Sequence, residues 1–175
     1  MTPYYKKLDC SNYEQINQQI KNYIHSKGIV ETTTNFWNPL STVEFIKSNP
    51  EFYKWLTGLG LKLHSLALTL GKHKDCCGAH TDAPPAVYKL SWPIENTSNT
   101  FNRWFIPSVD NPSCYIKEGG GSKFTNPEEL QEVARREVTS PCIINASIIH
   151  DVWCNDQAVF PRLGLQCMLF EEPTL

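Results

Sequence analysis

Residues 143–155 have the sequence IINASIIHDVWCN, and a second apolar stretch follows at 159–170. Asn155 and Asp156 stand between the two stretches, and both residue types favour turns. Two apolar runs joined by such a turn predict a hairpin with strands at about 141–153 and 159–170. We therefore expect an antiparallel β fold around this hairpin.

Arg162 is the residue of this hairpin that most needs an explanation. In the predicted pairing, Arg162 lies roughly opposite His150, with Cα atoms about 5 Å apart. Its strand face is otherwise apolar, and a buried arginine is costly unless an anion meets it. The pattern therefore indicates an anion-binding role for Arg162. A surface ion pair with Asp151 or Asp156 is the alternative.

Short strands continue upstream of the hairpin. Residues 66–70 alternate leucine with Ala67 and Thr69, as in a half-buried strand. The other expected strands are a segment around His80 and residues 87–94, 101–106 and 114–117. A helix is expected at about 126–136, and Gly119 to Ser122 are expected to form a flexible loop. Many short strands with few helices favour an antiparallel sandwich or barrel of the jelly-roll type.

The first third of the chain is predicted to be helical. Residues 13–27 carry apolar side chains at helical spacing. A capping-box pattern at Ser41 to Glu44 and a proline at position 50 predict the starts of two more helices. We expect all 175 residues to form one domain, in which a helical support at 1–60 packs on a β core at 61–171.

Composition excludes several classes of protein. The 16 basic and 18 acidic residues give a formal charge of −2, so neither nucleic acid nor an anionic membrane is expected as a partner. Seven cysteines without a framework pattern favour free thiols, and the adjacent Cys76 and Cys77 lack metal-site spacing. The first residues lack the apolar core of a signal peptide, and no apolar stretch is long enough for a membrane span. We expect a cytoplasmic protein.

The tripeptide His80-Thr81-Asp82 is the second informative stretch. Side chains in a strand alternate faces, so His80 and Asp82 point the same way and can hold one ion between them. His150, from a distant strand, completes a set of two histidines and one carboxylate. Such a set leaves open positions on the metal and is typical of non-haem Fe(II) oxygenases. The tripeptide alone is a weak signal, because it also occurs by chance in many chains.

The order His80-Thr81-Asp82, His150, Arg162 resembles the double-stranded β-helix superfamily of Fe(II)/2-oxoglutarate-dependent oxygenases. The similarity covers roughly residues 61–171. Residues 143–155, with Pro161 and Arg162, look like the final hairpin of its phytanoyl, prolyl and aspartyl/asparaginyl hydroxylase branches. The resemblance implies a mainly β, cupin-like jelly roll with N-terminal helices.

The same resemblance implies the roles of the site residues. His80, Asp82 and His150 would be the ligands of Fe(II), and Arg162 would bind the far carboxylate of 2-oxoglutarate. The expected reaction consumes O2 and 2-oxoglutarate, hydroxylates a C–H bond of a small-molecule or peptidyl substrate, and releases succinate and CO2.

The aspartyl/asparaginyl hydroxylase branch is similar at two further positions. It has a hydroxyl residue 11 positions before the first histidine and a basic residue nine positions after it, both in contact with 2-oxoglutarate. These offsets fall on Thr69 and Lys89, and Ser91 is a further candidate for the same site.

Two positions depart from the patterns of the family. The aspartyl/asparaginyl branch typically lacks the carboxylate ligand that Asp82 supplies, so its substrate is not carried over. The common Arg-x-Ser pattern ends here in Gly164, so Thr69 or Ser147 is expected to supply the missing hydroxyl.

Two other classes of function stay open. A cupin-type metal-dependent dioxygenase or isomerase that does not use 2-oxoglutarate would keep the ligands and give Arg162 a structural partner. A non-catalytic binding module would tolerate the loss of any ligand. The substrate itself is not indicated, although Trp92, Arg103 and Trp104 are candidates for the mouth of its binding site.

Overall fold

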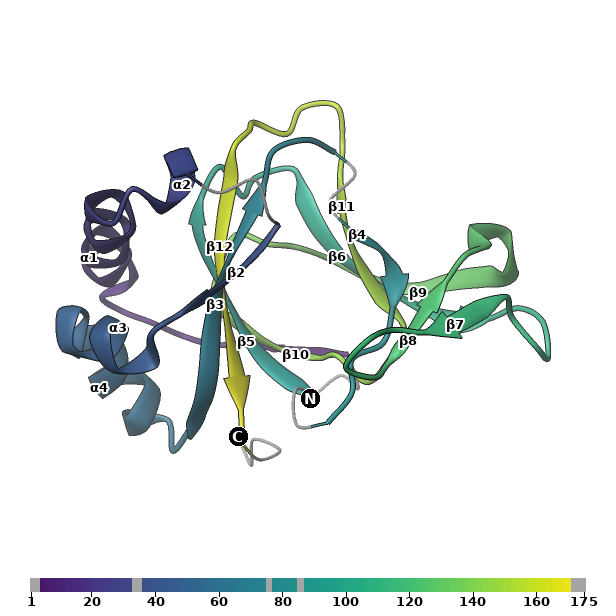
Figure 1. The fold of residues 1–175 in the computed structure, drawn as a ribbon, viewed down its shortest axis with the longest axis horizontal. Coiled ribbons are helices and arrows are strands. Elements are labelled where there is room, and N and C mark those ends of the chain that lie inside the picture. Colours follow the sequence, from purple (N-terminus) through teal and green to yellow (C-terminus); the bar gives the residue numbers. More distant parts are fainter. Residues whose placement is uncertain (1–3, 33–35, 75–76, 85–86, 171–175) are drawn as a thin grey trace.

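The protein consists of two six-stranded antiparallel sheets that face each other, with helices outside one of them (Figure 1). The computed structural model describes residues 4–32, 36–74, 77–84 and 87–170. Sheet A has the order β1 (Tyr5–Lys7), β10 (Cys142–Asn145), β5 (Tyr88–Glu95), β12 (Arg162–Leu169), β3 (Leu63–Gly71) and β2 (Trp37–Leu40). Sheet B has the order β7 (Cys114–Ile116), β8 (Ser122–Phe124), β4 (Cys77–His80), β11 (His150–Cys154), β6 (Thr100–Pro107) and β9 (Leu130–Glu137). The predicted fold class, a mainly β jelly roll with N-terminal helices, is confirmed.

The helices form where the sequence places their signals. They are α1 (Tyr13–Ser26), α2 (Ile29–Thr32), α3 (Thr42–Ser48), α4 (Pro50–Gly58) and a 3-10 turn, η1 (Pro127–Glu129). Ile16, Ile20 and Ile24 form the buried stripe of α1. The Ser41 side chain accepts a hydrogen bond from the backbone N–H of Glu44 and so caps α3. Among the described residues, no helix has both the length and the apolar character that a membrane crossing requires.

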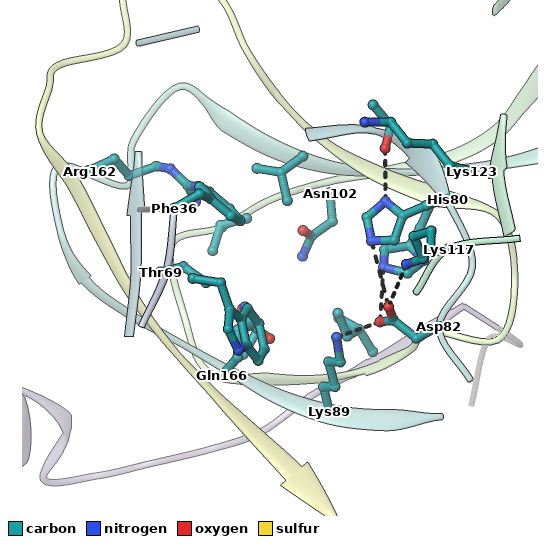
Figure 2. A pocket seen from close by; sticks show the side chains of 17 residues that line it. Phe36, Thr69, His80, Asp82, Lys89, Asn102, Lys117, Lys123, Arg162 and Gln166 are labelled. Carbon is teal, nitrogen blue, oxygen red and sulfur yellow. Dashed lines mark hydrogen bonds and ion pairs between the residues drawn. The ribbon is translucent and has the colours of Figure 1, made fainter. Parts of the chain in front are cut away.

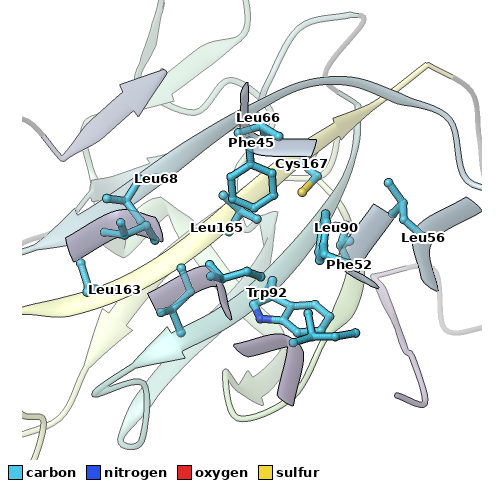
Figure 3. Close-up of a cluster of buried hydrophobic side chains, with 14 of the residues drawn as sticks. Phe45, Phe52, Leu56, Leu66, Leu68, Leu90, Trp92, Leu163, Leu165 and Cys167 are labelled. Carbon is cyan, nitrogen blue, oxygen red and sulfur yellow. The ribbon is translucent and has the colours of Figure 1, made fainter. Parts of the chain in front are cut away.

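The main hydrophobic core lies between sheet A and the helices (Figure 3). Phe45 and Phe52 from the helices pack with Trp92, Leu165 and other apolar residues of the sheet. Strand β3 presents its leucines to this core, whereas Thr69 lies on the other face and lines the space between the sheets. The strand is therefore buried on both faces from Leu66 to Gly71, and the expectation of a half-buried strand was wrong.

The final hairpin was predicted wrongly. Residues 141–153 form two strands in different sheets, β10 and β11, because an Asx turn separates them. The Asn145 side chain accepts hydrogen bonds from both the backbone N–H and the hydroxyl of Ser147. Strand β12 pairs with β3 and β5 in sheet A, while β11 pairs with β4 and β6 in sheet B.

Three other segments differ from expectation. The helix expected at 126–136 is the single turn η1 followed by strand β9, because pairing with β6 overrides the helical signal of the Asn-Pro-Glu-Glu sequence. The segment expected to be a helical support, residues 1–60, also contributes β1 and β2, which form the two edges of sheet A. The glycine-rich loop is a tight turn between β7 and β8 that packs against Thr81.

Candidate metal centre and binding cavity

A cavity of about 320 Å³ lies between the two sheets and is lined by the predicted metal ligands and by four of the residues predicted to contact 2-oxoglutarate. Those residues are Thr69, His80, Asp82, Lys89, Ser91, His150 and Arg162. Sheet A supplies four of them from β3, β5 and β12, and sheet B supplies the histidines from β4 and β11. The volume of the cavity lies within the range of typical small-molecule sites.

His80, Asp82 and His150 converge at one side of this cavity (Figure 2). One potential ligand atom from each residue lies within 4.8 Å of the other two. His80 Nε2 is 3.8 Å from Asp82 Oδ1, and His150 Nε2 is 3.9 Å from Asp82 Oδ2. The neighbours β4 and β11 pair His80 directly with His150, so the sheet itself holds the two rings together. The three groups can hold one metal ion between them.

Backbone carbonyls orient both imidazoles. His80 Nδ1 is 2.8 Å from the carbonyl oxygen of Gly78, and His150 Nδ1 is 2.9 Å from that of Ile148. A carbonyl oxygen only accepts hydrogen bonds, so each Nδ1 carries the hydrogen. In the neutral ring this leaves the lone pair on Nε2, which faces Asp82 and the partner histidine.

Burial keeps the histidines neutral. Desolvation, helped by the neighbouring His80, lowers the pKa of His150 to about 3. Desolvation also lowers the pKa of His80. For Asp82, desolvation acts to raise the pKa, but the Lys89 ammonium and the two neighbouring histidines together more than offset this, so the net shift of the pKa is downward. At neutral pH the site therefore offers two neutral imidazoles and a carboxylate, the protonation states that metal binding requires.

Two lysines contact the carboxylate of Asp82. Lys89 pairs with its Oδ2 from strand β5, and Lys117 Nζ lies 3.3 Å from its Oδ1. The Lys89 ammonium also lies 5.1 Å from the centre of the Trp37 ring at the edge of the cavity. The predicted residue Lys89 thus reaches the candidate metal centre itself.

Arg162 lies across the cavity from the histidines and Asp82 (Figure 2). Its side chain is buried, and its Nε and Nη2 atoms have no hydrogen-bond partner among the described residues. The guanidinium carbon is 5.9 Å from the centre of the Phe36 ring. A buried cation with unused donors can bind an anion. The expected cross-strand pairing with His150 was wrong, because Arg162 pairs with Gly71 in sheet A.

The alternative of a surface ion pair for Arg162 is also wrong. Asp151 forms a two-pronged ion pair with Arg103, in which Nε and Oδ1 are 2.9 Å apart. Asp156 pairs with Lys74. Arg162 is thus left facing the cavity from one sheet while His150 faces it from the other.

Thr69 fills the space next to the glycine at position 164. The two residues are paired across β3 and β12, and the Thr69 hydroxyl donates to the Gly164 carbonyl at 3.0 Å. A Cβ atom at position 164 would lie 3.0 Å from that hydroxyl oxygen, so Thr69 occupies the space that a serine there would need. Ser147, the other candidate, is exposed and bonded to Asn145. Ser91 accepts a hydrogen bond from Gln166 Nε2 at 3.1 Å.

Sequence reasoning missed several polar residues of the cavity. Within the part of the chain that the structure describes, the buried Asn102 Nδ2 and the Gln166 Oε1 have no hydrogen-bond partner. Strand alternation contained part of this signal, since it puts Asn102 on the face opposite to Arg103. Lys117 and Lys123 were missed because they come from the hairpin of β7 and β8.

The residues expected at the mouth do not line this cavity. Trp92 lies in the main core, and Trp104 packs in a second cluster with Cys142 and Ile144. Arg103 lines another cavity behind β11. Of the cysteine pair, Cys76 and the Cys77 side chain lie outside the described residues.

The turn between β7 and β8 is fastened to the segment that carries Asp82. The Thr81 N–H donates to the Ser122 carbonyl at 2.8 Å, and the Ser122 N–H donates to the Thr81 hydroxyl at 2.9 Å. Gly121 has a φ of +74°, and a Cβ there would lie 2.3 Å from the Thr81 carbonyl oxygen. This close approach requires glycine.

Gly121→Ala is therefore expected to disturb the candidate metal centre. Displacing Thr81 moves the neighbouring Asp82, so divalent-metal affinity should fall by roughly tenfold. Backbone strain should also lower the free energy of unfolding by about 1–3 kcal/mol. Titration with Co(II) and chemical denaturation measure the two effects.

Gly119→Ala is the matched control for this substitution. Gly119 has a similar φ of +81°, but no atom lies within 4 Å of its Cβ position. The Gly119→Ala variant should have similar backbone strain and unchanged divalent-metal affinity. Equal losses of metal affinity in the two variants would contradict the role assigned to the contact with Thr81.

Comparison with known proteins identifies a shared fold. No protein-family model and no curated protein match the sequence. The crystal structure of the non-heme alpha ketoglutarate dependent epimerase SnoN from nogalamycin biosynthesis matches with a TM-score of 0.52 and 13% identity, over 95% of this chain and 78% of that one. SnoN in complex with Fe3+, alpha ketoglutarate and nogalamycin RO matches with a TM-score of 0.49 and 11% identity, over 93% and 85%. At such low identity the first match shows a common jelly-roll fold and nothing finer.

Proposed function

We propose that this chain is an Fe(II)- and 2-oxoglutarate-dependent oxygenase that hydroxylates a C–H bond of a small-molecule or peptidyl substrate. The observation that carries the proposal is the facing arrangement of two parts of one cavity. His80, Asp82 and His150 converge on one side, and on the other lies the buried guanidinium of Arg162, whose Nε and Nη2 have no hydrogen-bond partner among the described residues. The fold shared with an alpha ketoglutarate dependent enzyme supports it.

The three converging side chains fit Fe(II). His80 and His150 offer neutral Nε2 atoms, and Asp82 offers a carboxylate at the same point. Three protein ligands leave open positions on the metal, which is the arrangement of non-haem Fe(II) oxygenases. Bound Fe(II) would supply the activation of O2, by which 2-oxoglutarate is oxidised to succinate and CO2 and the substrate C–H bond is broken.

The opposite wall fits the carboxylate of 2-oxoglutarate that does not bind the metal. Arg162 would donate charge-assisted hydrogen bonds from its unused nitrogen atoms. Thr69 holds the neighbouring carbonyl of Gly164 and lines the same wall. Lys89 and Ser91 would bind or orient the co-substrate from β5, between the metal side and the arginine side. Together these residues would fix the co-substrate at both ends.

The comparison with known structures supports one alternative reaction. The fold neighbour is an epimerase, so the same constellation could invert a stereocentre. Both reactions break a C–H bond of the substrate, and they differ in whether oxygen is added. Mass analysis of the product separates them, because a hydroxylated product gains one oxygen atom and an epimer keeps its mass.

Anaerobic titration with Fe(II), followed by 2-oxoglutarate, tests the proposal. A charge-transfer absorption band should appear only when both are present, and succinate should form after O2 is admitted. Protein without Fe(II) is the control and should give neither signal. Metal binding without any band on addition of 2-oxoglutarate would instead support a cupin-type dioxygenase or isomerase.

A further inference from the structure

The lining of the cavity carries an excess of positive charge. Among the described residues, four cationic side chains line it, from Lys89, Lys117, Lys123 and Arg162, against the single carboxylate of Asp82. The formal excess is therefore three charges. Fe(II) and the dianion of 2-oxoglutarate carry equal and opposite charges, so loading the site with both leaves this excess unchanged. A cavity of this kind attracts a further anion.

Two of the four cations have no role in the proposed binding of 2-oxoglutarate. Arg162 and Lys89 belong to the walls of sheet A, whereas Lys117 and Lys123 come from the hairpin of β7 and β8 in sheet B. Lys123 is paired in register with His80. Figure 2 shows Lys117 and Lys123 close to His80, on the side of the cavity opposite Arg162. An anion bound by these two lysines would lie beside the metal centre.

Metal binding would free Lys117 for such a contact. Its ammonium lies 3.3 Å from Asp82 Oδ1, and a divalent ion on that carboxylate would repel it. The Lys117 side chain is 27% exposed, so it has room to turn toward the open side of the cavity. No hydrogen bond or ion pair is described for the Lys123 ammonium within residues 4–32, 36–74, 77–84 and 87–170.

The backbone of the hairpin cannot easily move away. Lys117 is held by the hydrogen bond from its N–H to the Gly121 carbonyl, at 3.0 Å. The turn is in contact with Thr81 through Gly121 and Ser122. The two lysines therefore belong to a segment that is fastened to the Asp82 segment, which is what a positioned binding site requires.

We infer that the substrate carries a carboxylate or phosphate group that Lys117 and Lys123 bind beside the metal centre, an inference that rests on the proposed function. The reactive C–H bond lies close to this anionic group, because the two lysines flank His80 and Asp82. The cavity must also hold 2-oxoglutarate, so the part of the substrate that enters is small.

Anion binding to the anaerobic complex with Fe(II) and saturating 2-oxoglutarate tests the inference. Inorganic phosphate and N-acetylglycine serve as the two anionic probes, and N-acetylglycinamide is the neutral match of the second. At least one anion should shift the charge-transfer band saturably, and the amide should not. The probe that binds more tightly indicates whether the substrate group is a phosphate or a carboxylate.

The variant Lys117→Gln/Lys123→Gln should bind that anion at least tenfold more weakly. Lys47→Gln/Lys54→Gln makes the same change of charge on the exposed surface of α3 and α4 and should bind it like the wild type. Weak binding in both variants would indicate a general charge effect and overturn the inference.

The remaining outcomes separate this inference from the proposed function. If neither anion shifts the charge-transfer band, or if the amide shifts it equally, the inference is overturned and the proposed function still stands. Loss of the band on adding an anion would mean displacement of 2-oxoglutarate and would also overturn it. Absence of the band before any anion is added would overturn the proposed function and the inference together.

Discussion

His150→Ala is expected to weaken Fe(II) binding by more than about 100-fold, since even residues that only orient a metal ligand contribute about 10- to 100-fold. His150 is buried, its Nδ1 is held by the Ile148 carbonyl, and its Nε2 faces Asp82. The substitution leaves two ligands, too few to hold the ion against water. Calorimetric titration with Co(II), which replaces Fe(II) in such sites and resists oxidation, measures the loss.

His64→Ala is the matched control for the loss of an imidazole. His64 lies at the exposed end of β3, where its ring packs against Phe170. Its removal should leave metal affinity unchanged. Co(II) affinity within a factor of two of the wild type in His150→Ala, with an intact fold by circular dichroism, would rule out His150 as a ligand.

Arg162→Ala is expected to raise the 2-oxoglutarate requirement by about 10- to 100-fold, which corresponds to the loss of a charge-assisted contact of roughly 1.5–3 kcal/mol. Metal affinity should change little, because Arg162 lies across the cavity from the histidines. Arg162→Lys should be intermediate, since it keeps the charge and loses the planar fork of donors. The 2-oxoglutarate dependence of the charge-transfer band provides the measurement.

The stability of the Arg162→Ala protein provides an internal check. The guanidinium is buried, and two of its nitrogen atoms are unpaired among the residues that the structure describes, so its removal should not lower the free energy of unfolding by the amount expected for a paired buried arginine. Arg135→Ala, which removes a more exposed arginine paired with Glu132, should leave the 2-oxoglutarate requirement unchanged. If Arg162→Ala leaves the 2-oxoglutarate requirement unchanged, Lys89 rather than Arg162 would be the residue that binds the carboxylate.

The sequence alone determined the parts of this protein that depend on nearby residues. The spacing of Ile16, Ile20 and Ile24 was sufficient to predict the buried face of α1, because the helical repeat is local. The separation of two residues between His80 and Asp82 predicted that both side chains reach one ion, and they do converge, although β4 ends at His80 and Asp82 lies beyond the strand whose alternation was assumed. The order of these residues with His150 also led to the correct fold class.

Only the tertiary structure decided which distant segments meet. The local signals around Asn155 predicted a hairpin, yet β11 and β12 belong to opposite sheets and Arg162 faces His150 across a cavity. The lysines of the β7 and β8 hairpin reach the cavity through a contact with Thr81 that no local pattern indicates. The physical reason is that strand partners are chosen by the burial of whole faces and by hydrogen bonding between distant strands, whereas propensities and turn signals describe only a few consecutive residues.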